Sequence, residues 1–363
     1  MSSAAATITP VATGSVRKTL LLQTTVALIL SLAIGLYFWV DSRYPSLLKK
    51  LHSGQSIKVS GALSFDALMP VKPEMSLPVR VERTAINWMW TNRIGMTFGL
   101  GFGAALLTLL STLPGVRFQS AASNTLLGAV AGVPLGVCAN CVAPIGRGLF
   151  VGGASPNTVL ATMISSPTLN VVVLMMTFAL FPLPVALVRL AVPLLLLVSV
   201  PLLVRRTPPA QREACPVPAP DGWLRPTGST LKTYLKNLGN LAVATIPFMI
   251  LAAVLGALLA EIIPAQSIPA NVTVLGIVLV ALAGTFLPVP MAFDVAIAFI
   301  LMVRGVPLPY VVTLLCTLGA FSIYSLFILG RTMSWRTAAS FFGAVMLLGV
   351  TAGIGAGLLQ HSF

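Results

Sequence analysis

Long uncharged stretches of mostly apolar residues alternate with two polar segments along the chain. The first apolar run, Leu20–Val40, has about 21 residues, which is the length that a helix needs to cross a bilayer. The later runs are Ile94–Val116, Phe118–Gly146, Gly148–Val188, Leu190–Val204, Asn237–Ala260, Ile262–Phe293, Val295–Val303, Gly305–Gly330 and Thr337–Gln360. This pattern predicts an all-α, polytopic integral membrane protein.

Basic residues near the helix ends predict the orientation of the chain. Arg17 and Lys18 precede the first apolar run, which places the N-terminus inside the cell under the positive-inside rule. The segment 205–236 carries six basic and two acidic residues and is also expected inside. We therefore divide the chain into a disordered N-terminus (1–16), a first transmembrane helix (17–40), an extracytoplasmic loop (41–86), a first membrane repeat (87–204), a cytoplasmic linker (205–236) and a second membrane repeat (237–363).

An internal repeat relates the two membrane halves. The stretch Leu135–Leu174 can be laid over Leu287–Leu326 without a gap. Gly153 then falls on Gly305, just before a proline-rich helix start in each copy, and the segment after Ser165 falls on the segment after Thr317. The identity is weak, but the layout of breaks and apolar runs is the same.

The lengths of the segments predict one re-entrant hairpin in each repeat. The stretch 118–151 is too short for two full spans, so we expect a hairpin entering from inside, with its tip near Cys138–Pro144. Full spans at 91–113, 156–181 and 183–204 give the unit an odd number of crossings, which inverts the second copy and puts its tip near Pro288–Asp294. Hairpin arms that are full spans would leave this parity unchanged. We expect about seven full spans plus two hairpins, in the manner of inverted-repeat transporters.

Composition excludes several other classes of protein. Hydrophobic residues make up 57% of the chain and charged residues only 8%, whereas soluble domains carry about a quarter charged residues. The net charge of +14 falls in short segments beside apolar runs, where it favours contact with membrane lipids rather than nucleic acid. No nucleotide-binding, zinc-protease or haem motif is present, so we expect neither an enzyme nor a bound cofactor.

Two cysteines lie inside the most irregular apolar stretch. Cys138 and Cys141 form a C-x-x-C within Gly132–Asn170, a segment too rich in proline and glycine for a plain membrane helix. Irregular backbone at membrane depth is tolerated only where it is buried in protein or lines a cavity. Thiolates bind soft ions such as Cu(I) and, by extension, trivalent arsenic, so both cysteines are candidate metal and substrate ligands. The alternative is that they are small apolar packing residues.

Asp294 is the second candidate. The other seven acids lie in the polar segments or at a helix end, whereas Asp294 lies inside an apolar run at the start of the second hairpin's return arm. Intramembrane carboxylates are costly and are functional by default, so we expect Asp294 to couple a proton to transport. The alternative is a structural role, either capping a half-helix or pairing with Arg304.

Further polar residues complete the predicted site. Ser165, Ser166, Pro167 and Asn170 break a helix and free carbonyls and polar side chains at mid-depth, although such kinks also occur as plain structure. Asn140 and Pro144 at the first tip are expected to contact the substrate. Arg147 and Arg304 are candidate gating residues that could equally extend toward headgroups.

The run from Cys138 to Asn170 resembles a known signature. It reads C-x-x-C-x-x-P-I-x-R-G-L…G-A-S…I-S-S-P-T-L-N, and it is similar to bacterial predicted permeases that include organoarsenical efflux permeases. Those permeases read C-S-C-G-x-I-P, so that, counted back from Pro144, Cys138 falls on the first cysteine, Asn140 on the second and Cys141 on the glycine. The resemblance covers roughly residues 90–330.

The second copy resembles the family's P-x-C-x-x-x-A-D-x-x-I-A, with Asp294 on the acid and with Pro290 and Met291 around the expected cysteine. The resemblance implies a multi-span permease with paired repeat units and cysteines in the pathway. The departures at the cysteine positions leave the substrate open.

These observations predict a permease of the bacterial inner membrane that moves a small soft metal, metalloid or sulfur-containing solute by alternating access. Two rivals stay open. One is a non-transporting scaffold or assembly subunit that binds a protein partner through the loop 41–86. The other is a membrane thiol oxidoreductase.

Overall fold

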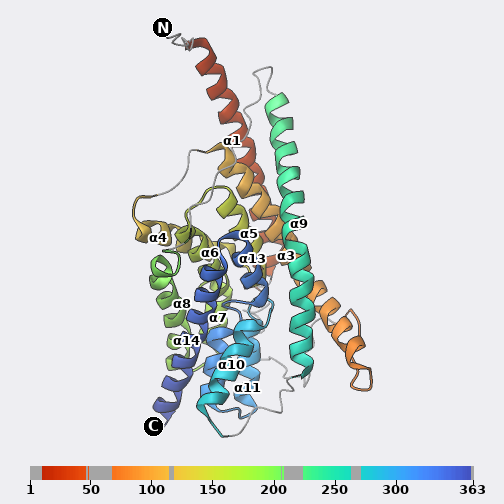
Figure 1. The fold of residues 1–363 in the computed structure, drawn as a ribbon, viewed down its shortest axis with the longest axis vertical. Coiled ribbons are helices and arrows are strands. Elements are labelled where there is room, and N and C mark those ends of the chain that lie inside the picture. The colour runs from red at the N-terminus through yellow and green to blue at the C-terminus, as the bar shows by residue number, and fades with distance from the viewer. Residues whose placement is uncertain are drawn as a thin grey trace, which may run out of the picture.

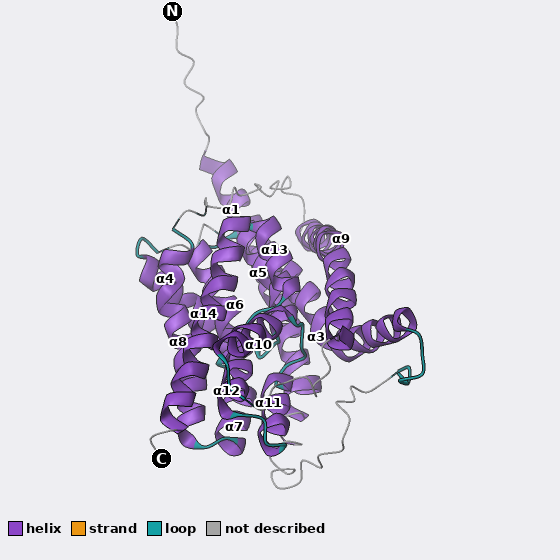
Figure 2. Ribbon diagram, turned by 60° about the horizontal axis from the view of Figure 1, so that its bottom comes forward, coloured by secondary structure: helices purple, strands orange, loops and turns teal. Residues whose placement is uncertain are grey.

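The computed structural model describes residues 10–45, 48, 68–113, 118–205, 207, 224–262 and 271–360. These residues are almost entirely helical and, apart from an isolated bridge between Leu318 and Phe321, form no β-structure (Figure 2). The helices are α1 (Pro10–Phe38), continued by a π-helical turn (Trp39–Arg43), α3 (Leu77–Thr112), α4 (Ala121–Gly132), followed by a 3₁₀ turn (Val133–Leu135), α5 (Ala139–Val151), α6 (Pro156–Thr168), α7 (Val171–Leu180), α8 (Leu183–Leu203), α9 (Leu224–Ile262), α10 (Val274–Phe286), α11 (Phe293–Val303), α12 (Leu308–Thr317), α13 (Ile323–Thr332) and α14 (Trp335–Gln360).

Within the described residues, 5 helices are long and apolar enough to cross a membrane. They correspond to α1, α3, α8, α9 and α14, and the pair α6–α7, bent by 42°, adds a sixth span when the pair is counted as one. The predicted all-α, polytopic membrane fold is confirmed. Our count of seven spans also included α12–α13, whose two short helices are separated by the break at 318–322.

Three helices extend into segments that we expected to be polar loops. α3 begins at Leu77, inside the predicted loop 41–86, because Ser76 is extended and Pro78 lies in the first helical turn, where its missing N–H is no loss. α9 begins at Leu224, inside the predicted linker 205–236, and α1 begins at Pro10 rather than at residue 17. Residues 1–9 of the N-terminus, residues 46–47 and 49–67 of the loop, and residues 206 and 208–223 of the linker lie outside the described residues.

Both halves of the chain repeat one order of elements. A long helix (α3 or α9) is followed by a hairpin (α4–α5 or α10–α11), a broken helix (α6–α7 or α12–α13) and a last span (α8 or α14). Gly153 and Gly305, which the overlay matched, both have positive φ, at 92° and 82°. Asn170 and Ser322, which the same gapless overlay aligns, both cap the second half of the broken helix.

The two repeats pack against each other reciprocally. α3 contacts α9, α8 contacts α14, and each hairpin return arm contacts the other repeat's broken helix, α5 with α13 and α11 with α7. In Figure 1 the first hairpin lies toward the end that carries the N-terminus, and the second lies toward the opposite end. This arrangement is the one expected of inverted repeats, and it places each hairpin return arm against the broken helix of the other repeat.

Glycines allow the hairpin arms to approach their neighbours at backbone distance. A Cβ on Gly95 of α3 would lie 2.6 Å from Cys141 Sγ, and one on Gly99 would overlap the Cys141 carbonyl. On α4, a Cβ at Gly128 would overlap the backbone of Thr158 in α6. The close approach fixes the helix that carries both cysteines against α3, since no side chain separates them.

Candidate functional site

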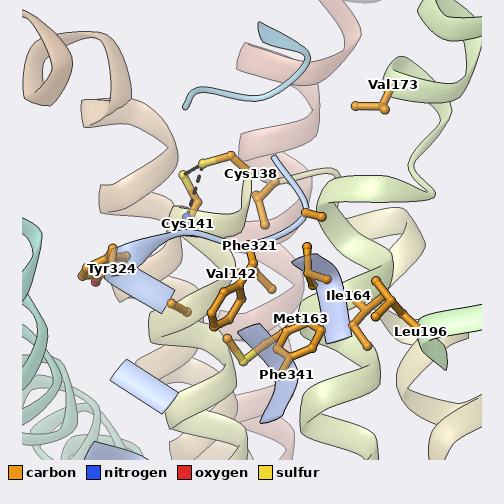
Figure 3. Close-up of a cluster of buried hydrophobic side chains, with 14 of the residues drawn as sticks. Cys138, Cys141, Val142, Met163, Ile164, Val173, Leu196, Phe321, Tyr324 and Phe341 are labelled. Carbon is orange, nitrogen blue, oxygen red and sulfur yellow. Dashed lines mark hydrogen bonds between the residues drawn. The ribbon is translucent and has the colours of Figure 1, made fainter. Parts of the chain in front are cut away.

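The first hairpin tip ends where α5 begins, and the two cysteines form that start. Cys138 is the N-cap, with its Sγ accepting a hydrogen bond from the Cys141 amide at 3.3 Å. The two sulfurs lie 2.6 Å apart and point toward each other (Figure 3). Both side chains are buried, as free cysteines rather than a disulfide.

The helix that follows the predicted hairpin tip begins within the tip itself. α5 begins at Ala139, and Pro144 lies inside it. Proline has no N–H, so Pro144 cannot donate to the carbonyl of Asn140 four residues earlier. The helix nevertheless continues, with Cys138 capping its start and residues 139–146 buried in the protein. Pro144 packs against α3, since a Cβ on Gly103 of α3 would lie 2.9 Å from the Pro144 carbonyl oxygen.

Asn140 joins the first hairpin tip to the second repeat. Its Nδ2 donates to the carbonyl of Val289, in the second hairpin tip, at 3.1 Å. Its Oδ1 accepts from Ser322 Oγ, at the break of the second broken helix, at 2.7 Å. Ser325 Oγ donates to the Ala139 carbonyl at 2.8 Å. The start of α5 is thus hydrogen-bonded to both irregular segments of the opposite repeat.

Arg43 is a site residue that sequence reasoning missed. It lies at the end of the π-helical turn after α1, is buried, and has its guanidinium 4.4 Å above the Phe38 ring. Its Nε has no hydrogen-bond partner among the described residues, and its charge lies within electrostatic range of both sulfurs. We had assigned Arg43 to the polar loop because it follows the first apolar run, and no sequence signal separates it from the loop's other basic residues.

The first helix is attached to the same tip. Trp39 Nε1, one turn before Arg43, donates to the Pro134 carbonyl at 2.7 Å. The side chain of Arg43 packs over Gly136, which has a positive φ of 55°. π-Helical turns within α-helices are frequent at functional sites, and this one directs Arg43 toward the cysteines.

Asp294 lies in the first turn of α11 and forms a buried ion pair with Arg189 of α8. Arg189 Nη2 donates to Asp294 Oδ2 at 2.6 Å, whereas Arg189 Nε and Nη1 have no partner among the described residues. The alternative pairing with Arg304 is wrong, because Arg304 is exposed at the other end of α11. We had treated Arg189 as the boundary between two apolar runs, although a lone charge in an otherwise apolar stretch is itself an intramembrane signal.

The ion pair and the cysteine tip meet at one segment, the break at 318–322 of the second broken helix. A Cβ on Gly319, which has a positive φ of 93°, would lie 2.9 Å from the Asp294 carboxyl carbon. Cys316, which we assigned no role, lies within electrostatic range of both Asp294 and Arg189. Three residues beyond Gly319, Ser322 contacts Asn140. This segment therefore touches the start of each hairpin return arm.

The predicted polar residues of the first broken helix make their hydrogen bonds within the first repeat. Ser166 Oγ contacts the backbone of Val137 beside Cys138, accepting from its amide at 3.3 Å. Ser165 donates to the Gly128 carbonyl at 3.5 Å, and Pro167 lies in the last turn of α6, where the 42° bend occurs. Asn170 donates to the Ser166 carbonyl at 2.8 Å and accepts from the Val173 amide at 3.0 Å. The polar groups of Asn170 are thus used within its own helix pair.

Metal-binding capacity at the tip rests on the two sulfurs. No group of three or more His, Cys, Asp or Glu side chains gathers among the residues that the structure describes. Asn92 Oδ1 of α3 lies 4.0 Å from Cys138 Sγ and accepts a hydrogen bond from it. The arrangement can offer two soft sulfur ligands, amide oxygen donors and the Arg43 cation to a small solute.

Paired membrane repeats whose hairpin tips meet at a buried polar centre define the class of polytopic membrane transporters built from broken helices. The sequence model of one such family, the predicted permeases ArsP_1, matches residues 108–357. The chain belongs to this family of predicted permeases, which confirms the resemblance found in the sequence. The UPF0718 protein YraQ of Escherichia coli (strain K12) is 29% identical over 239 residues, which are 64% of this chain and 67% of YraQ. No solved structure matches the chain.

Proposed function

We propose that this permease moves a small soft metal, metalloid or sulfur-containing solute across the bacterial inner membrane by alternating access, and that Cys138 and Cys141 bind the solute. One observation carries the proposal. The two sulfurs lie at the start of a hairpin arm, and the residue between them, Asn140, is hydrogen-bonded to both irregular segments of the opposite repeat. A solute on the sulfurs would therefore act directly on the contact between the repeats.

The surroundings of the sulfurs favour negative charge. The N-terminus of α5 carries the positive end of the helix dipole, and the Arg43 guanidinium lies within electrostatic range. Deprotonated sulfurs prefer soft, polarisable ions, so a cysteine pair that ionises on binding suits trivalent metalloids or soft metal ions, whereas a sulfur anion would be attracted by the Arg43 cation. Asn92 and Ser166, on two neighbouring elements, supply polar contacts at the same tip.

Asp294 is proposed to couple proton movement to transport through its pair with Arg189. A protonated Asp294 loses the ionic part of its attraction to Arg189, which frees α11 from α8. Because Gly319 packs against Asp294 and Ser322 contacts Asn140, such a release would reach the cysteine tip through the break at 318–322. This is a route by which a proton and a solute could bias one conformational equilibrium.

The test is transport by the purified full-length protein in proteoliposomes. The panel contains trivalent arsenic and antimony, Cu(I), Ag(I) and thiosulfate, each measured in both directions. Cys138→Ser/Cys141→Ser is compared with the wild type and with Cys215→Ser, which removes a thiol from the linker 205–236. Loss of transport of one solute in the tip variant alone is the expected result.

Other outcomes contradict the proposal. Equal transport of every solute by the wild type and the tip variant would exclude the cysteines as ligands. A reversible Cys138–Cys141 disulfide that exchanges electrons with a quinone, without solute movement, would favour the thiol oxidoreductase. A stoichiometric protein partner on a chain that transports nothing would favour the scaffold.

A further inference from the structure

A cavity of 470 Å³ lies between α5, α9, α13 and the start of α14, and it is lined by two arginines. Arg147 comes from α5 and Arg331 from the last turn of α13. The two guanidinium groups lie within electrostatic range of each other, and the described residues that line the cavity include no acid. Two cations that face one space repel each other unless an anion lies between them.

The arginines are held in place but keep donors free for a ligand. Arg147 is half-buried and donates Nη1 to Thr332 Oγ1 at 3.1 Å, which uses one of its five N–H groups. Arg331 is exposed and lies 6.0 Å from the centroid of the Phe248 ring. The ion pairs among the described residues involve Arg80 and Arg189, so neither cavity arginine is neutralised by an acid there.

Aromatic side chains shape the cavity and indicate where it opens. Phe248 stacks on Phe327 with ring centroids 5.7 Å apart, and Phe327 meets Trp335 edge-on at 6.1 Å. Tryptophan beside arginine is typical of the membrane–water interface. Val243, on the α9 wall, is 78% exposed on a membrane-spanning helix, so the cavity lies beside a lipid-facing surface.

We propose that this cavity binds a phosphate-bearing anion between Arg147 and Arg331, the phosphate being that of an anionic phospholipid headgroup or free phosphate. The guanidinium fork matches phosphate oxygens in a bidentate manner, and basic pockets between transmembrane helices bind anionic headgroups. The alkyl chains of a lipid would lie along the α9 surface around Val243. This site is separate from the cysteine tip and does not depend on the proposed function.

The position of the site links it to both repeats. Arg147 lies in the same helix as Cys141, about 9 Å further along α5 at 1.5 Å per residue. Arg331 and Phe248 belong to the second repeat. A bound phosphate would therefore hold α5 to α13 and α9.

The experiment measures ligand binding to the purified full-length protein by native mass spectrometry and by thermal unfolding. The probes are phosphatidylglycerol, phosphatidylcholine and inorganic phosphate. The variants are Arg331→Gln, Arg147→Lys and the double variant Arg147→Gln/Arg331→Gln. Arg336→Gln is the matched control, because it removes the same charge from an exposed residue next to Trp335 that does not line the cavity.

We expect phosphatidylglycerol to bind and to raise the unfolding temperature, with affinity falling about fivefold for each arginine removed and remaining unchanged in Arg336→Gln. Competition by inorganic phosphate would identify free phosphate as a ligand, whereas its absence would identify the lipid. Equal binding of both lipids, or equal losses in Arg331→Gln and Arg336→Gln, would overturn the proposal. Arg331→Gln alone decides the matter if the double variant does not fold, because Arg331 is exposed.

Discussion

Arg189 of α8 and Asp294 of α11 form a buried ion pair, 2.6 Å from Nη2 to Oδ2, that ties the first repeat to the second. The exposed fractions of the two side chains are 1% and 3%. Water therefore cannot solvate either charge if the other is removed, and both residues must be considered as one unit.

The pair predicts a strongly non-additive effect on stability. Arg189→Gln and Asp294→Asn should each lower the free energy of unfolding by about 3–5 kcal/mol, because each leaves a buried charge without its partner. The double variant Arg189→Gln/Asp294→Asn should recover most of that loss. Thermal unfolding of the purified protein in detergent measures all three, and additive losses would show that the two side chains act independently.

The same pair predicts a change in energy coupling. If Asp294 couples protons, Asp294→Asn should abolish solute accumulation driven by a pH gradient while leaving solute exchange at equal pH intact. The measurement compares both modes in proteoliposomes. Arg336→Gln, which removes a charge from an exposed residue of the second repeat, serves as the control and should leave both modes unchanged. Accumulation that persists in Asp294→Asn would remove Asp294 from the coupling mechanism.

Arg43 predicts a charge preference at the cysteine tip. The sulfurs of Cys138 and Cys141 are labelled either with a negatively charged or with a positively charged thiosulfonate reagent. The ratio of negative to positive labelling should fall about five- to tenfold in Arg43→Gln, because the attracting cation is lost. Arg43→Lys should keep most of the ratio, because the cation remains. Labelling is followed by mass spectrometry in a Cys215→Ser background. An unchanged ratio in Arg43→Gln would mean that its charge does not act on the sulfurs.

The close approach of α4 to α6 predicts that Gly128 tolerates no side chain. A Cβ there would overlap the backbone of Thr158, so Gly128→Ala should lower the free energy of unfolding by about 1–3 kcal/mol. Gly239 in α9 is the matched control, because a Cβ there meets nothing within 4 Å. Gly239→Ala should be neutral or stabilising by about 0.5–1 kcal/mol. Equal unfolding temperatures for the two variants would contradict the packing described for α4.

The layout of the fold could be predicted from the sequence because its breaks depend on local residue chemistry. Gly153 and Gly305 mark the same turn in the two repeats, and positive φ is a property that glycine supplies on its own. Asn170 and Ser322 each cap a half-helix through their own side chains. Such signals involve neighbours a few residues away, so a single sequence contains them.

The partners at the candidate site could not be predicted, because they come from distant helices. Asp294 was identified as an intramembrane acid, but Arg189 lies 105 positions away. Arg43 was read as part of a loop, and only the packing of the first helix against the hairpin tip brings it to Cys138 and Cys141. The sequence places Pro144 at the hairpin tip, because the burial that surrounds it inside α5 is a tertiary feature.

Main-chain oxygens accept several of the hydrogen bonds between the hairpin tips and their surroundings. Asn140 donates to the Val289 carbonyl, Ser325 to the Ala139 carbonyl and Trp88 to the Pro288 carbonyl. Every residue type carries that oxygen, so the side chains at 139, 288 and 289 can change without removing an acceptor. The specificity of the fit between the two halves therefore lies with the donor side chains of Asn140, Ser325 and Trp88, which only a few residue types could replace.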